Sequence, residues 1–213
     1  MRSTVRVCAL GLGVWMAAGG AAFAQSAFSE KSIGLAVQSA FGNVTSQSFG
    51  GEAGYFVTPN IGVFVEGGQV RDASPSALGA AAQRIAAALS IGFSVREPVS
   101  FFGGGIRYAF TGYGKLEPYV LGGAGAASVK RDVKFMAGGV DITSSLGSAP
   151  YYTVLGSDLT GTVTKPMFTA GGGVAYHATS LLRVDLGYRF GRIMTDTSGT
   201  NVSRAGIGIG VTF

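Results

Sequence analysis

The chain has 213 residues, of which 47% are hydrophobic and only 13% are charged, and its formal net charge is +5. So small and diffuse a positive charge is not the footprint of a nucleic-acid-binding protein, and the single cysteine, Cys8, leaves no pair for a disulfide or a cysteine-ligated metal. Beyond the N-terminal region there is no uninterrupted apolar segment of about 20 residues, the length that a membrane-spanning helix needs.

The N-terminal region has the pattern of a cleaved export signal. Two arginines precede a short apolar run, 7–18, and a stretch of small residues ends at Ala24. We therefore predict a signal peptide over residues 1–24 and a mature chain that forms one domain over residues 25–213. Removing the signal leaves 14 basic and 11 acidic side chains, a net charge of +3.

Eight segments of the mature chain alternate apolar with small or polar residues at a period of two, which predicts β-strands with one apolar face. The last segment is the clearest, and it ends on an aromatic residue. A closed transmembrane barrel needs such a strand, which pairs with the first strand and faces lipid. The segments are residues 32–41, 48–57, 61–66, 100–110, 116–128, 167–176, 182–190 and 204–213.

The connections between these segments alternate between short and long. Short turns follow the second, fourth and sixth segments, whereas the third and fifth are followed by long loops, 71–98 and 129–165. This alternation is typical of outer-membrane barrels, whose long loops lie outside the cell. We predict an all-β protein, an eight-stranded antiparallel up-and-down transmembrane β-barrel. Aromatic residues fall into two rings, as expected at the two membrane interfaces: Tyr55, Tyr108, Phe110, Tyr176 and Phe213, and Phe41, Phe49, Phe102, Phe168 and Phe190.

The two long loops contain signals for structure of their own. In the second extracellular loop, Ser74 as N-cap and Pro75 as first helical residue predict a short helix over 76–89. In the third loop, Gly138-Gly139 predicts a hairpin above the membrane. A soluble, lipocalin-like barrel is the alternative, but its interior would be overfilled by this many large side chains.

Four stretches resemble the OmpA/OmpX-like family of outer-membrane β-barrels (porin-type). They are G-G-x-x-G-Y-F-V-T-P-N from Gly50, P-Y-V-L-G-G-A-G from Pro118, Y-R-F-G-R-I from Tyr188, and the terminal strand. The resemblance implies a barrel domain in the bacterial outer membrane, without the peptidoglycan-binding domain of full OmpA proteins. It also implies that the terminal strand is the signal read by the barrel-assembly machinery, through Gly208, Val211 and Phe213. Gly206 departs from the family, which usually has a polar residue there.

The inward face of the predicted barrel carries equal numbers of acidic and basic side chains. Unpaired charges in a narrow lumen are costly, so we predict a charge network that fills it. A gate or a proton path is the alternative reading of the same residues. The predicted network consists of Glu52, Glu66, Glu117 and Asp185 with Arg107, Arg183, Arg189 and Arg204.

Nothing in the sequence has the pattern of an active site. His177 is the only histidine, which excludes any site that needs two. With Ser180 and Asp185 it resembles the barrels that remove or transfer acyl chains on lipid A, but it falls at a periplasmic turn, so we predict a solvated histidine. No metal cluster, phosphate loop or nucleophile elbow appears. We therefore expect no catalytic residue, no metal site and no cofactor.

The long loops are the predicted place of function, because surface loops usually carry binding residues. We expect a structural or surface-interaction role, with a narrow porin-like channel as the alternative and a lipid A-modifying enzyme as a weaker one. The expected partners are outer-membrane lipid and lipopolysaccharide. The basic residues predicted to contact lipopolysaccharide phosphates, where the fifth and sixth strands leave the membrane, are Lys130, Arg131, Lys134 and Lys165.

Overall fold

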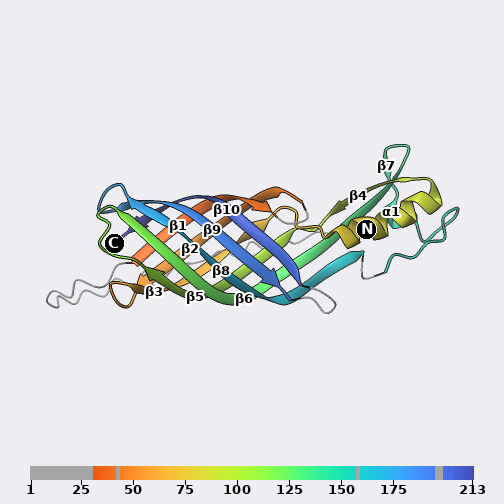
Figure 1. Cartoon of the computed structure of the whole chain (residues 1–213). Coiled ribbons are helices and arrows are strands. Elements are labelled where there is room, and N and C mark those ends of the chain that lie inside the picture. Colours follow the sequence, from red (N-terminus) through yellow and green to blue (C-terminus); the bar gives the residue numbers. More distant parts are fainter. Residues whose placement is uncertain (1–30, 42–43, 157–158, 195–198) are drawn as a thin grey trace, which may run out of the picture.

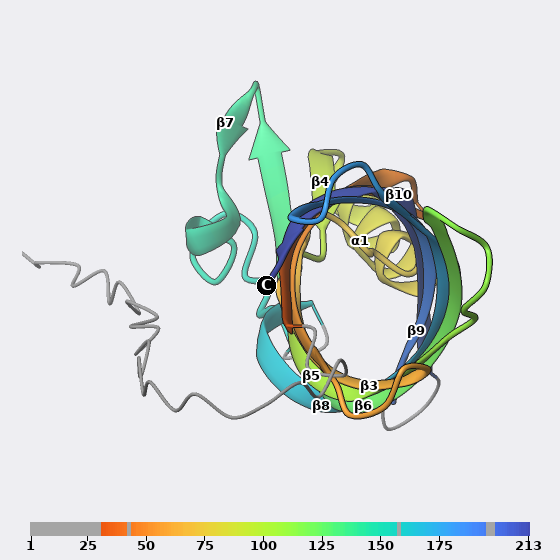
Figure 2. The same cartoon turned by 90° about the vertical axis from the view of Figure 1, so that its left-hand side faces the viewer.

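A computed structural model describes residues 31–41, 44–156, 159–194 and 199–213 (Figure 1), so the predicted signal peptide lies outside the described residues. Eight antiparallel strands pair in sequence order, and the last pairs with the first, which closes the barrel seen end-on in Figure 2. The predicted fold is confirmed. The barrel strands are β1 (Lys31–Phe41), β2 (Ser46–Phe56), β3 (Ile61–Val70), β5 (Val99–Ala109), β6 (Leu116–Ala137), β8 (Thr160–His177), β9 (Leu182–Ile193) and β10 (Thr200–Thr212).

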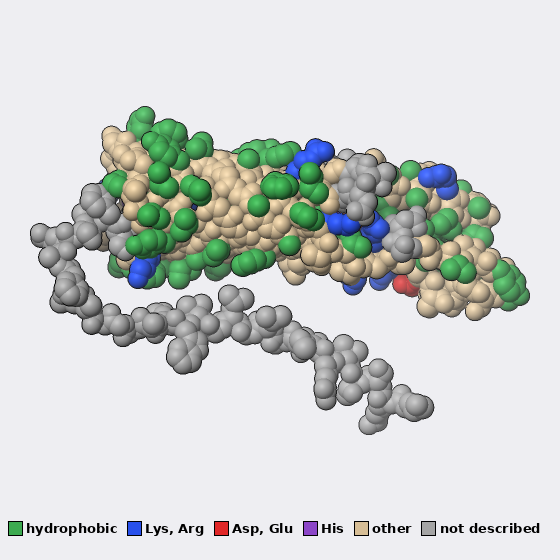
Figure 3. Space-filling view, turned by 90° about the horizontal axis from the view of Figure 1, so that it is seen from below, with side chains coloured by type: hydrophobic (Ala, Val, Ile, Leu, Met, Phe, Trp, Pro, Cys, Tyr) green, Lys and Arg blue, Asp and Glu red, His purple; other side chains and the backbone are tan. Residues whose placement is uncertain are grey.

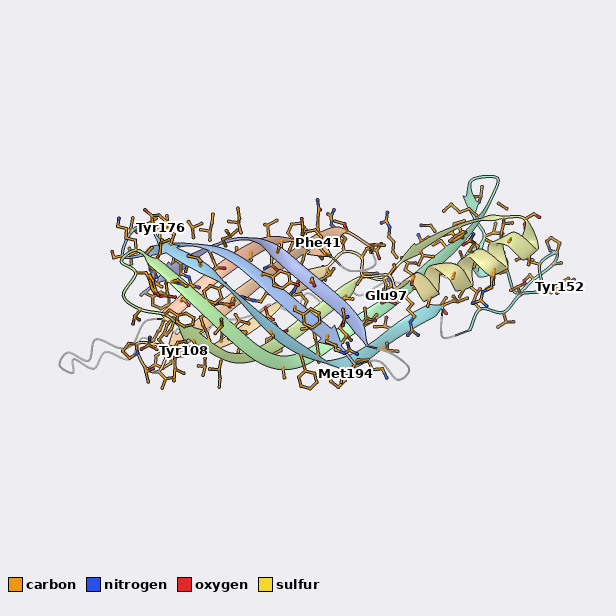
Figure 4. All side chains as sticks on the ribbon, viewed as in Figure 1. Phe41, Glu97, Tyr108, Tyr152, Tyr176 and Met194 are labelled. Carbon is orange, nitrogen blue, oxygen red and sulfur yellow. The ribbon has the colours of Figure 1, made fainter. Side chains whose placement is uncertain are left out.

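The apolar side of each strand faces outward. Leu35, Ile106 and Leu186 have 74%, 59% and 62% of their surface exposed, and hydrophobic side chains lie in patches along the barrel wall in Figure 3. The lipocalin-like alternative, which needs these side chains inside, is therefore wrong. The predicted aromatic rings are also exposed on this wall, with Tyr108 and Tyr176 at the end that has short turns and Phe41 nearer the end that has long loops (Figure 4).

Two strands of the barrel continue far beyond the others at the long-loop end. β6 and β8 remain paired as far as Asp132 and Thr160, where the structure adds β4 (Gly92–Arg96) to the other edge of β6. A turn at Gly138 and Gly139, both with positive φ, leads into β7 (Val140–Asp141), which confirms the predicted hairpin. The sequence analysis ended the fifth segment at residue 128, whereas β6 continues to Ala137, and it missed β4, which is only five residues long.

Helix α1 (Ser76–Leu89) lies over the mouth of the barrel, where it is seen through the ring in Figure 2. It buries Leu78, Ala82 and Ala86, which recur every four residues and so share one helical face. The predicted helix is confirmed, but its cap is corrected. Pro75 is the N-cap, and the Ser74 hydroxyl instead donates a hydrogen bond to Asp72 Oδ1 at 2.5 Å.

We call the part above the barrel the head; it comprises the described residues of 71–98 and 130–160. The head has its own hydrophobic core beneath α1. This core also includes residues next to the short helix η1 (Thr143–Ser145). The fully buried members are Leu78, Ala82, Ala86, Val133, Phe135, Leu146 and Leu159. In the described part of the chain, no helix is long and apolar enough to cross a membrane.

Candidate functional site

The middle of the lumen is bridged by ion pairs between strands that are not neighbours. Glu52 accepts hydrogen bonds from Arg107 at 2.5 Å and from Arg189 at 2.7 Å. The Arg189 guanidinium is also 3.7 Å from Glu66, which in turn accepts a hydrogen bond from Arg204 at 3.3 Å. The three arginines are 2–6% exposed. Each buried cation therefore has a carboxylate partner, which is the condition for keeping charges inside a protein.

Tyr119 connects this network to the short-turn end of the lumen. Its hydroxyl donates to Asp185 Oδ1 at 2.8 Å and accepts a hydrogen bond from Arg189 at 3.3 Å, while the Arg107 guanidinium lies 4.4 Å from the ring centroid. A Cβ atom added to Gly173 or Gly187 would lie 2.7 or 2.8 Å from the hydroxyl, so only glycine leaves room for this side chain. The sequence analysis missed Tyr119, because the phase of its glycine-rich strand was ambiguous.

The eight predicted network residues are placed in two groups. Arg183 donates to Asp185 at 3.2 Å and so joins the six residues that are linked through Arg189 and Tyr119. Glu117 lies apart from them and contacts His177 Nε2 at 3.2 Å. The prediction of a solvated turn histidine is corrected in part: His177 ends β8 beside the short turn, and its side chain is 24% exposed but pairs with Glu117.

Apolar layers lie on either side of the charged network. Towards the short-turn end the inward side chains include Phe56, Phe64 and Leu121. Towards the long-loop end a larger layer of inward residues sits below the head. We call this second layer the plug; it consists of Ala40, Val70, Val99, Phe101, Ala127, Val129, Met167, Ile193 and Val202.

The lumen is thus occupied by the plug towards the long loops and by paired charges in its middle, while apolar and charged side chains share the short-turn half. A cavity of about 60 Å³ is left beside Ser32, Arg183 and Asp185, which is room for a few waters only. In the described part of the chain, no group of three or more His, Cys, Asp and Glu side chains is placed to hold a metal ion.

The four basic residues predicted to form one lipopolysaccharide-binding cluster lie on two faces of the β6–β8 ladder. Lys130 and Lys134 are exposed on its outer face, whereas Arg131 and Lys165 belong to the inner face, because alternate strand residues point to opposite sides. Lys134 Nζ is 3.8 Å from Asp141, and Arg131 Nε is 3.8 Å from Glu97. The predicted grouping of the four on one surface is therefore corrected.

Other exposed basic residues join Lys130 and Lys134 just beyond the ring of aromatic residues at the long-loop end. The Arg71 guanidinium lies 5.6 Å from the ring centroid of Phe49, and Arg192 donates to Asn201 at 3.2 Å. Basic side chains gather where the hydrophobic band ends in Figure 3. We call this set the basic girdle: Arg71, Arg96, Lys130, Lys134 and Arg192.

The three residues of the predicted assembly signal lie at the seam that closes the barrel. Phe213 and Lys31 exchange backbone hydrogen bonds of 2.9 Å in both directions. Val211 and Phe213 are 48% and 62% exposed on the lipid-facing side, while Gly208 faces inward opposite Ala36.

A polar joint, which we call the neck, connects the head to the barrel. It consists of Ser46, Asp72, Ser74, Glu97 and Arg131, and the sequence analysis did not single it out. Glu97 is 3% exposed. Burial raises the pKa of its carboxyl to about 7, against the opposing effect of Arg131, and the nearby Asp72 carboxylate raises it further.

No protein-family model and no curated protein sequence matches the chain. Several solved structures match the chain. Neisserial surface protein A has a TM-score of 0.52 and 17% sequence identity, covering 87% of this chain and 97% of that one. The N-terminal β-barrel domain of Pseudomonas aeruginosa OprF has a TM-score of 0.50 and 17% identity, covering 87% and 99%. The resemblance to OmpA/OmpX-like proteins is thereby confirmed at the level of the fold: this chain is an eight-stranded transmembrane β-barrel of the outer-membrane type.

Proposed function

We propose that this chain is a non-conducting protein of the bacterial outer membrane whose barrel serves as an anchor and whose head interacts with other molecules at the cell surface. The observation that carries this proposal is the division of the molecule into a filled barrel and a separately cored head. A channel needs an open lumen, whereas an anchor needs a rigid, satisfied interior. The long loops form a folded structure above the membrane, and surface loops are where binding residues are usually found.

The far end of the head supports a role in surface contact. Tyr152 and Val154 have 76% and 88% of their surface exposed there, and Figure 4 shows Tyr152 at the point farthest from the barrel. Val140, at the tip of the hairpin, is 65% exposed. Amphipathic and apolar side chains held clear of the membrane suit contact with another macromolecule. We propose no catalytic role, because Asp185 is held by Arg183 and Tyr119 and not by His177, whose partner is Glu117.

The filled lumen predicts that the purified, refolded protein passes no steady current across a planar bilayer. Ions would have to pass the apolar plug and a set of paired charges. The matched test is Val99→Gly with Ile193→Gly in the plug, which opens space without removing a charge. Brief openings in this variant alone support the proposal, whereas a large steady wild-type conductance would establish the narrow channel instead.

We further propose that lipopolysaccharide binds to the basic girdle. Its side chains are exposed beyond the lipid-facing band, from the level of Arg71 and Lys130 up to Lys134, which lies opposite Ser94 of β4. A cationic side chain near an anionic membrane surface contributes about 1 kcal/mol. Arg131 and Lys165 are left out of this site, because they belong to the inner face of the ladder.

Replacing all five girdle residues with Gln should lower the affinity for lipopolysaccharide at least tenfold and remove most of its salt dependence. Binding to lipopolysaccharide in mixed micelles would be measured at low and high salt. The matched control is Lys31→Gln with Lys115→Gln, which removes exposed cations at the short-turn end of the barrel. Equal affinity in both variants would contradict the girdle but leave the anchor-and-head proposal standing.

A further inference from the structure

The neck lies between two hydrophobic cores. Val99 belongs to the plug of the barrel, and Val95, four residues earlier in the chain, packs against the core of the head. Glu97 lies midway between them and is 3% exposed, close to the 2% of Val99 and more buried than Val95. A carboxyl group is thus enclosed at the one point where the β4–β5 connection passes from the head to the barrel (Figure 4).

Hydrogen bonds tie three segments together around this carboxyl. Asp72 Oδ1 accepts from the backbone N–H of Glu97 and of Ser74, each at 3.0 Å. The N–H of Ala73 donates to the Glu97 carbonyl at 2.9 Å. Ser46, at the start of β2, donates from its hydroxyl to the Asp72 carbonyl at 2.7 Å. The chain entering α1, the chain leaving β4 and the first loop therefore meet at one joint.

Within the described part of the chain, the charges around Glu97 do not balance it completely. Arg131, on the inner face of β6, has its Nε 3.8 Å from the carboxylate, which is beyond hydrogen-bond distance. Asp72 adds a second negative charge on the other side. Lys165 of β8 also belongs to the inner face. It lies four residues nearer the membrane than Gly161, the residue that pairs with Arg131. Arg71, Arg96 and Lys130, from the adjoining segments, are exposed on the outside.

We propose that the neck is a pH-sensitive joint, in which protonated Glu97 holds the head closed on the barrel and ionised Glu97 loosens it. The ionised carboxylate is buried beside a second carboxylate, and it can regain hydration only if the neck opens. Arg131 compensates for part of this cost but not for all of it. The head would then be held more tightly over the mouth in a mildly acidic medium than in a neutral or alkaline one.

The direction of the pH effect follows from the pKa of Glu97, which is about 7 in the closed neck and 4.5 in its ordinary state. Because the folded pKa is raised, the closed neck is most stable below the ordinary value. Its stability falls as the pH rises towards 7, and it is constant above that. The equilibrium constant for opening is expected to rise about tenfold between pH 6 and pH 8.

Hydrogen exchange of the refolded protein in lipid nanodiscs tests this proposal. Exchange of the Ala73 and Glu97 amides, corrected for the intrinsic pH dependence, should show the tenfold rise in the wild type. In Glu97→Gln, which keeps the size of the side chain without its charge, the exchange of these amides should not rise in this way. Asp72→Asn, which removes the second negative charge, should move the midpoint to lower pH, and Arg131→Gln should move it higher.

Asp141→Asn is the matched control, because Asp141 is an exposed carboxyl of the same head, and the hydrogen bonds from Thr143 lower its pKa. This variant should retain the full response. An equal pH response in the wild type and Glu97→Gln would overturn the proposal. So would midpoints that do not move in opposite directions in Asp72→Asn and Arg131→Gln.

Discussion

Arg189→Ala is expected to destabilise the barrel by about 3–5 kcal/mol, because it removes the cation that bridges the buried carboxylate of Glu66 and the partly buried one of Glu52. Glu52 would keep Arg107, and Glu66 would keep Arg204, but each would lose one partner in a lumen that excludes bulk water. The Tyr119 hydroxyl would lose its donor as well. The folded fraction can be followed against urea as the compact band of unboiled protein in SDS gels.

Arg183→Ala provides the comparison for this effect. Arg183 is as buried as Arg189, at 6%, but it pairs with Asp185, which keeps its hydrogen bond from Tyr119. A smaller loss of stability is therefore expected than for Arg189→Ala. Equal losses in the two variants, or none in either, would show that the central bridge does not stabilise the lumen.

Phe135→Ala should unfold the head while leaving the barrel intact. Phe135 is fully buried at the centre of the head core, and truncating such a side chain costs about 3–5 kcal/mol. A small core cannot absorb this loss, whereas the barrel keeps its closed ladder and its filled lumen. Limited proteolysis should cut the head rapidly in this variant, and the unboiled protein should still migrate as a compact species.

Phe93→Ala is the matched control, since Phe93 lies opposite Phe135 in the β4–β6 ladder and is 39% exposed. Its head should resist proteolysis nearly as well as the wild type. If Phe135→Ala also abolished the compact band, the head and the barrel would unfold as one unit, contrary to their separate cores.

The lipid-facing part of the fold was predictable because every strand must present apolar side chains on the face that contacts lipid. Leu186 in β9 and Ile209 in β10 both fall on the apolar face of a strict alternation, and both are exposed on the barrel wall. Above the membrane the apolar residues face inward and the polar residues face outward. Val133 and Phe135 of β6 are apolar and face inward, towards the head core, whereas Lys134 faces water. The alternation thus changes phase along one unbroken strand, which is why the sequence analysis ended it at residue 128.

The charged lumen was predictable in composition but not in its contacts. Alternation placed Glu52 and Arg189 on the inner face, yet their contact joins β2 to β9, and the stagger of a closed barrel sets which levels meet. Glu97 could not be found in this way. It lies between two strands, where no periodicity applies, and only the packing of head on barrel shows that it is buried.

The long β6–β8 ladder also determines how the molecule responds to a mechanical load. A pull on the hairpin, away from the membrane, would draw β6 and β8 lengthwise against β5 and β9. Each of those two ladders has eleven register pairs within the barrel. The backbone hydrogen bonds would then be loaded together, in shear, instead of breaking one after another from an end. In a molecule attached through its head, tension would therefore act along the paired strands of the barrel, where many hydrogen bonds share the load.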